Sequence, residues 1–417
     1  MFRLIFLTLT FLFTTISICF PQGEAAVPFL LLQTNAESHG MGYSSVARIT
    51  DEPLAFTTNP AHLGMQSFNE HFSIGYNYSD WLPSFNLDLW VRTFGVTSGF
   101  NLNKLNPDFP SVHVGFGYSN IFLNYGDFIK TDPSSPEPIR TYRSYDYANL
   151  YSIGIGYEYF IKISAGLTYK NIVSRLREEK LYEGRAFAFD FGFLIDIPIV
   201  NLISDSPSNI LNLSPAYEPF LNLTLGFANN NYTSGTIYYV DPAQADPLPR
   251  FARVGIGVNI GLYDKSTDWN PVSLKWTIEK NDMLVTRDSG RHWEYQSGLG
   301  DINFFKEVIL GKTNEKTEKL TGWELNLGEV ISIYGDRFEE DYNHGNRRLS
   351  TNGWGLNTKG IKKLLLNPNS PDISNDFLRF ILNKVDFRFI QTEIKPDEKN
   401  HPLTGIKFTT VNLIISI

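Results

Sequence analysis

Large apolar and small or polar residues alternate without a break in the segment Tyr151-Ser152-Ile153-Gly154-Ile155-Gly156-Tyr157. Successive side chains of a β-strand point to opposite faces, so such a strand has one apolar face and one small or polar face. We count about fourteen segments of this kind, and single-chain bacterial membrane barrels have an even number of strands. The segments cover residues 72–79, 85–92, 94–102, 112–119, 151–159, 163–171, 187–197, 221–229, 251–262, 272–279, 282–288, 322–333, 385–391 and 405–417.

The composition favours a membrane barrel over the alternative, a secreted β-sandwich. Aromatic residues make up 14% of the chain, and tyrosines such as Tyr78, Tyr118 and Tyr159 stand at segment ends, where a membrane barrel carries its aromatic girdle. The second face of the segments is mostly Gly, Ser, Asn and Thr, which suits a lumen. Beyond residue 25 no apolar run is long enough for a membrane helix, and a closed barrel is the other structure that spans a bilayer. The sequence predicts an all-β fold: a transmembrane antiparallel β-barrel of about fourteen strands, with an N-terminal plug segment and one or two short helices.

The first residues read as a secretory signal peptide. Arg3 precedes an apolar run, and small residues follow up to a cleavage site after Ala25. The only cysteine, Cys19, follows Ile18, where a lipoprotein signal needs a small residue, so the lipoprotein alternative is disfavoured. We therefore expect residues 1–25 to be the signal peptide, 26–68 the plug segment and 69–417 a barrel of the cell outer membrane.

Charge and motifs point away from enzymes and nucleic-acid binding. The net charge of −8 comes without a basic cluster, so no nucleic-acid partner is expected. His39, His62 and His71 follow no metal-ligand spacing, and the sequence holds no Gly-x-Ser-x-Gly nucleophile motif. We expect no catalytic residues, no metal and no cofactor; an outer-membrane enzyme is the last-ranked alternative.

Some stretches depart from the strand pattern. Residues 128–148 and 230–250 read as long loops, because they combine Pro with Asp, Ser or Asn. Residues 298–320 and, more clearly, 372–384 read as short helices, the second with Ser374 as its N-cap. We expect the second helix to plug the lumen or cap an opening. In the last strand the apolar parity changes at Thr409–Thr410, which predicts a β-bulge there.

The proposed plug segment contains a distinctive series of small motifs. The series consists of Gly40-Met41-Gly42, Asp51-Glu52 and Asn59-Pro60-Ala61 followed by Leu63. The glycines permit positive φ and close backbone approach, and Asn before Pro signals a turn. Such a compact block could fold back into the barrel lumen.

These motifs resemble the PorV/PorQ family, which is similar in turn to the FadL group of outer-membrane barrels. The family pattern is roughly G-M-G-G-A-x-V-A-x-x-D-D-x-x-A-x-x-x-N-P-A-G-L. The residues that match it are Gly40, Met41, Gly42, Val46, Ala47, Asp51, Ala55, Asn59, Pro60, Ala61 and Leu63. Tyr43 and His62 replace glycines and Glu52 replaces an aspartate, so any positive φ at His62 would be strained. Outside residues 38–64 the likeness is only to the general barrel layout.

Two functions follow from the resemblance and stay open here. A PorV-like barrel would take part in type IX protein secretion, with secretion-system or cargo proteins as partners. A FadL-like barrel would be a passive channel for a hydrophobic small molecule, with an N-terminal plug and a side opening. Either barrel would meet outer-membrane lipid and the barrel-assembly machinery. An apolar groove between plug and wall would favour the channel, and broad, ordered outer loops would favour the secretion platform.

Overall fold

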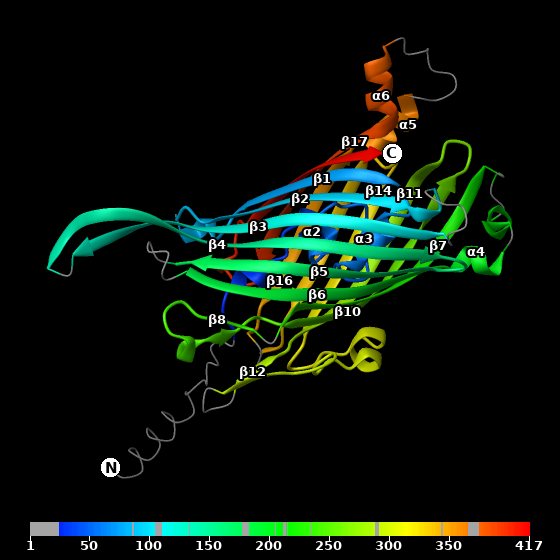
Figure 1. Ribbon diagram of the computed structural model, residues 1–417. Helices are drawn as coiled ribbons and strands as arrows, with labels where there is room; N and C mark the ends of the chain where they lie inside the picture. The colour runs from blue at the N-terminus through cyan, green and yellow to red at the C-terminus, as the bar shows by residue number, and fades with distance from the viewer. Residues whose placement is uncertain are drawn as a thin grey trace.

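The computed structural model describes residues 25–417, except 86, 105–110, 133, 177–182, 205, 212–213, 215, 234, 288–291, 343–344 and 366–374. Residues 1–24 of the expected signal peptide and Ser374 therefore lie outside the described residues. Within them, fourteen antiparallel strands form one closed barrel (Figure 1), as the sequence predicts. Its strands are β1 His71–Asp80, β2 Trp90–Asn101, β3 Val112–Asp132, β4 Ser135–Glu158, β5 Lys162–Arg175, β6 Glu183–Pro198, β7 Tyr217–Tyr232, β10 Phe251–Asp264, β11 Trp269–Met283, β14 Glu318–Leu327, β15 Ile331–Glu339, β16 Arg348–Asn357, β17 Val385–Pro396 and β18 Lys407–Ser416.

The wall closes where β18 pairs with β1, in a register that joins Phe72 to Ile415. Alternation sets the two faces of the wall. On β4 the apolar positions face outward, with Ile153 41% and Ile155 51% exposed, whereas Gly154 faces the lumen. A belt of exposed apolar side chains around a closed barrel is the surface that lipid covers. No helix among the described residues is long and apolar enough to cross a membrane.

The strand total is as predicted, but several predicted segments are wrong. Segment 85–92 is mostly the connection before β2 and shares this single wall strand with segment 94–102. Segment 282–288 ends β11 and continues into β12, which is not part of the wall. In the other direction, segment 322–333 contains parts of two strands, β14 and β15. β16 was missed because Arg348, Ser350 and Asn352 occupy its outward positions and break the apolar pattern. Two surplus segments thus offset two missing strands.

We name the two ends of the barrel by what they carry. The terminal rim is the end where β1 begins and β18 ends. The ribbon rim is the opposite end, from which the β3–β4 hairpin projects beyond its neighbours (Figure 1). Residues 128–148, predicted to be a loop, are in fact mostly the two strands of this hairpin. The other short elements outside the wall are η3 Pro83–Phe85, η4 Leu102–Lys104, α4 Ile199–Ile203, η6 Pro207–Leu211, β8 Thr236–Ile237, η7 Pro242–Gln244, β9 Asp246–Pro247, β12 Val285–Arg287, β13 Trp293–Tyr295, η8 Phe304–Ile309, α5 Thr358–Leu365 and α6 Asp376–Lys384.

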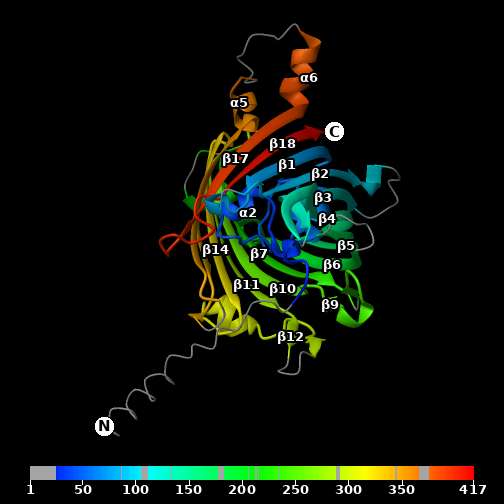
Figure 2. The same cartoon turned by 90° about the vertical axis from the view of Figure 1, so that its left-hand side faces the viewer.

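Two further sequence predictions need correction. Helix α6 exists within 372–384, but it projects away from the barrel wall instead of plugging the lumen (Figures 1 and 2). The bulge at Thr409–Thr410 is absent, since β18 pairs with β1 and β17 without a register shift. Phe408 breaks the apolar parity because it faces the lumen, where its ring stacks on His39 with centroids 3.4 Å apart.

Candidate functional site

Residues 26–68, hereafter the luminal segment, run through the inside of the barrel (Figure 2). The segment starts near the ribbon rim, where the Ala26 amide donates to the Pro247 carbonyl over 2.9 Å, and ends at the terminal rim before β1. Its short helices are η1 Pro28–Leu31, α2 Ala36–Gly40, η2 Ala55–Thr57 and α3 Ala61–Gln66. Helix α2 packs on β15–β18 and α3 on β2–β6, so the segment bridges opposite walls.

The first glycine motif is pressed against the inside of β14–β16. Gly42 has a φ of 60°, and a Cβ there would lie 2.1 Å from the Thr321 carbonyl oxygen and 2.7 Å from the Arg337 nitrogen. The Gly42 amide donates to the Thr351 hydroxyl (2.9 Å), which donates to the Gly40 carbonyl (3.0 Å). Met41 is fully buried, and its carbonyl occupies the space beside Gly322. Only glycine combines this φ with so close an approach to a backbone.

The departures from the family pattern have unequal consequences. Tyr43, which stands in place of a glycine, keeps a positive φ of 67°. Its ring contacts His39 and Phe338, with centroid distances of 4.5 and 5.6 Å. His62 lies within α3 and is not among the residues with positive φ, so the strain considered for it does not arise. Its Nε2 lies 3.2 Å from the Ser45 carbonyl.

The second motif, Asn59-Pro60-Ala61, connects the luminal segment to β5 and β6. The Asn59 side-chain amide donates to the Val46 carbonyl (2.8 Å) and the Phe193 carbonyl (3.3 Å), and its oxygen accepts from the Ala61 amide. Pro60 occupies the N-cap position of α3. Leu63 packs over the inward glycines of β3 and β4, among them Gly115 and Gly154. A Cβ on either glycine would collide with Leu63, so these wall glycines make room for the segment.

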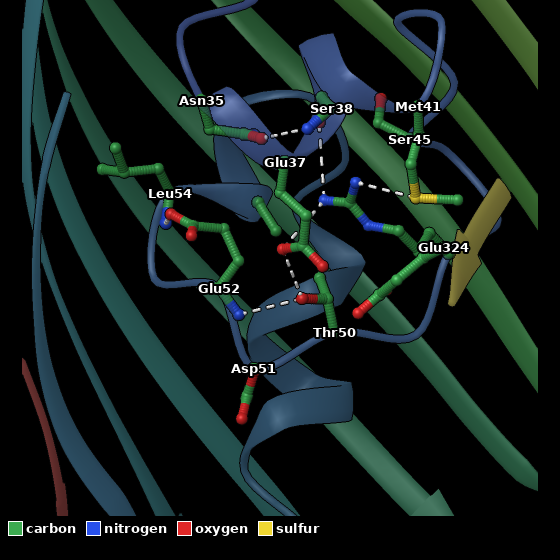
Figure 3. Close-up of polar contacts among 12 residues, drawn as sticks. Asn35, Glu37, Ser38, Met41, Ser45, Thr50, Asp51, Glu52, Leu54 and Glu324 are labelled. Atoms are coloured by element: carbon green, nitrogen blue, oxygen red, sulfur yellow. Dashed lines mark hydrogen bonds and ion pairs between the residues drawn. The ribbon is translucent and has the colours of Figure 1, made fainter. Parts of the chain in front are cut away.

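A buried ionic cluster lies at the centre of the luminal segment. Glu37 is fully buried and pairs with Arg48 at 3.5 Å and with Arg388 of β17 at 3.8 Å. It also accepts a 2.9 Å hydrogen bond from Thr50 (Figure 3). Arg388 also pairs with Asp51 at 2.7 Å. Buried charges are tolerated only when they are paired, so this cluster strongly favours one seating of the segment against β17.

Two more carboxylates join the segment to the wall. Glu279 of β11 accepts hydrogen bonds from the Ser45 and Val46 amides at 2.6 and 2.8 Å. Glu52, which lies in the luminal segment and in none of the strands, accepts from Asn412 of β18 at 2.5 Å. Burial, followed by the nearby Glu37 charge, raises the pKa of the Glu52 carboxyl to about 7.

A groove of about 670 Å³ lies on the outer face of the barrel wall, over β14, β15 and β16. The strand register places Trp323, Gly335 and Asn352 side by side on the outward face of β14, β15 and β16. Because Gly335 has no side chain, the Trp323 ring lies directly over it, where a Cβ would be only 2.7 Å from a ring carbon. Ile333 and Trp354 line the groove toward the terminal rim, and Arg337 and Ser350 line it toward the ribbon rim. The groove is thus apolar at one end and polar at the other.

The wall under the groove is irregular and thin. Asp336 has a φ of 139°, a conformation that residues other than glycine rarely adopt. On the luminal side, Gly42 touches the backbone of the next residue, Arg337. The groove and the Gly40-Met41-Gly42 motif are therefore separated by a single layer of backbone. Sequence reasoning missed the groove, because its residues come from three strands, of which β15 was not separated from β14 and β16 was not recognised.

The comparisons with known proteins give fold-level matches. No protein-family model matches the sequence, and no curated protein matches it. Among solved structures, a FadL homologue of Pseudomonas aeruginosa is 8% identical, with a TM-score of 0.39, over 92% of this chain and 98% of that one. The toluene transporter TodX of Pseudomonas putida is 10% identical, with a TM-score of 0.39, over 92% and 97%. The toluene transporter TbuX of Ralstonia pickettii is 10% identical, with a TM-score of 0.30, over 91% and 96%. These values are low, and the barrel assignment rests on the strand pairing. The PorV/PorQ resemblance stays a prediction.

Proposed function

We propose that the protein is an outer-membrane channel for hydrophobic small molecules. In this proposal the luminal segment closes the lumen as a plug, and the groove over β14–β16 is where a ligand passes between protein and lipid. The groove is the observation that carries the proposal. It is a recess on the outer face of the wall with an apolar end, and the Gly40-Met41-Gly42 motif lies behind it. Toluene transporters are among the barrels compared above, and we propose the same class of ligand here on the strength of the groove.

The chemistry of the groove suits a small apolar or aromatic molecule. Trp323 and Trp354 offer flat apolar faces, and aromatic rings pack favourably against such faces. The lumen itself is lined by charged and amide side chains that the luminal segment already occupies, such as Glu279 and Asn412. We therefore expect a hydrophobic ligand to pass along the groove on the outer face of the wall and not through this polar lumen.

Filling the groove tests the proposal. Asn352→Trp places an indole beside Gly335 without entering the lumen, because Asn352 faces outward. Ser98→Trp is the matched control, since Ser98 faces outward on β2, far along the wall. Uptake of labelled toluene by cells expressing each variant is the measurement. We expect Asn352→Trp to reduce uptake to the level of cells without the protein and Ser98→Trp to leave it unchanged. Equal uptake by both variants would refute the proposal.

A second candidate, the PorV-like secretion platform, is favoured by one observation. The β3–β4 ribbon projects at one rim, and β8, β9, β12 and β13 lie outside the wall at the same rim. From there the chain folds back, so that η8 packs against the outer face of β10 and β11. Bacterial barrels carry their longer loops on the outer side, so we place the ribbon rim outside the cell. Shortening the ribbon by removing residues 126–141 should abolish secretion of cargo if this candidate holds, while toluene uptake should persist if the channel proposal holds.

A further inference from the structure

Helix α6 has an arrangement that nothing above explains. It joins β17 directly, because Lys384 ends the helix and Val385 begins the strand. It stands out from the wall crosswise to the strands at the terminal rim, and both views agree on this (Figures 1 and 2). Since the strands cross the membrane, a helix crosswise to them runs along the membrane surface.

The side chains of α6 divide into two faces. Phe377, Phe380 and Ile381 have the three- and four-residue spacing that places side chains on one side of a helix. Asp376 and Arg379 share another side and form an ion pair of 3.7 Å. The phenylalanines are 72% and 52% exposed, so the described chain leaves most of these two side chains uncovered, whereas Ile381 is partly buried.

A helix as short as α6 needs contacts outside itself to be stable. Isolated helices shorter than about 12–15 residues are marginal in water, and α6 has nine residues. Its packing within the protein is on β17 at its base. The exposed phenylalanines therefore point to an apolar phase outside the protein that stabilises the helix.

The wall beside α6 indicates which phase this is. The outward-facing Phe387 is 48% exposed and lies three residues beyond Lys384. Its partner on β18 is Leu413, and Val411, two residues from Leu413 on the same face, is 47% exposed. This surface is part of the lipid-facing belt. The base of α6 thus lies beside the lipid-facing wall, at the rim where the strands end.

We propose that α6 is a membrane-surface helix, which inserts Phe377 and Phe380 into the headgroup–acyl boundary of the leaflet at the terminal rim. Amphipathic helices bind membrane surfaces in this way, with the apolar face buried and the charged face in water. The proposal requires only that the barrel lies in a bilayer and is independent of the channel proposal.

A labelling experiment on the full barrel tests the proposal. Residues 25–417 contain no cysteine, since Cys19 is the only one in the sequence. Phe380→Cys and the matched control Arg379→Cys can therefore each carry one polarity-sensitive dye. Both proteins are reconstituted in vesicles of phosphatidylethanolamine and phosphatidylglycerol. The gel shift on boiling checks that each variant has folded.

We expect the dye at position 380 to be blue-shifted, shielded from aqueous iodide and quenched by spin-labelled phospholipid. The dye at position 379 should be open to iodide. Equal access of iodide to both dyes would overturn the proposal. A dye at position 380 that is shielded from iodide but not quenched by the labelled lipid would also overturn it, because a protein surface would then cover α6. If that shielding is lost when the protein is diluted with more lipid, the covering surface is a second copy of the protein.

Discussion

At the residue scale, the glycine at position 42 combines two constraints that can be separated. It has a positive φ, and its Cβ position is occupied by wall backbone. Gly298, in a turn at the ribbon rim, has a nearly equal φ of 66° but no atom within 4 Å of its Cβ position. The two residues therefore isolate the cost of collision from the cost of backbone conformation.

Gly42→Ala should lower the stability of the folded barrel far more than Gly298→Ala. The left-handed conformation alone costs about 1–2 kcal/mol for a residue with a Cβ, and the collision with Thr321 and Arg337 adds to it at position 42 only. The temperature of the gel shift in detergent measures the difference. Equal shifts for the two variants would show that Gly42 does not press on the wall.

The ionic cluster gives a second prediction at this scale. Arg48→Met removes one of the two cations that pair with Glu37 and leaves Arg388. Leaving a buried charge with no partner costs about 3–5 kcal/mol, so we expect a loss below that range but above that of an exposed pair. Arg143→Met is the control, because the Arg143–Asp127 pair is half exposed and such pairs contribute about 0–1 kcal/mol. Denaturant titration of both variants should separate them clearly. A loss no larger for Arg48→Met than for the control would argue against the cluster.

At the scale of the strand, every second residue of β4 faces the lipid, and charged substitutions at these positions are costly. Ile153 lies between Phe116 and Leu167, within the exposed apolar stretch from Tyr151 to Tyr159. The inward positions obey a different constraint. A side chain on Gly154 would meet the Gly64 amide at 2.5 Å, so substitutions there disturb the luminal segment instead.

Ile153→Arg should impair assembly, whereas Tyr159→Arg at the β4–β5 turn should be tolerated. An arginine on the lipid face costs about 2–4 kcal/mol at the bilayer midplane and about 0–1 kcal/mol near the interface. Folding yield into vesicles, read from the gel shift, is the measurement. Similar yields for the two variants would mean that Ile153 does not face the middle of the bilayer.

At the scale of the whole molecule, local patterns predicted the barrel but not its details. Alternation is a property of each strand by itself, so strands such as β4 and β10 could be recognised from sequence. β15 and β16 escaped because Gly335, Arg337 and Asn352 interrupt the outward apolar series. The motif residues of the luminal segment could be named in advance. Their wall partners Thr351, Glu279 and Arg388 could not, because those contacts join residues more than two hundred positions apart.

The role of the luminal segment as the closure of the lumen can be measured directly. The wall closes between β1 and β18 without it, so a chain lacking residues 26–68 retains every strand pair. Planar-bilayer conductance of this shortened chain and of the full chain is the measurement. We expect the shortened barrel to insert and pass a steady ion current through its polar lumen, while the full barrel stays closed. Two barrels with the same conductance, whether both open or both closed, would contradict the assignment of residues 26–68 as the plug.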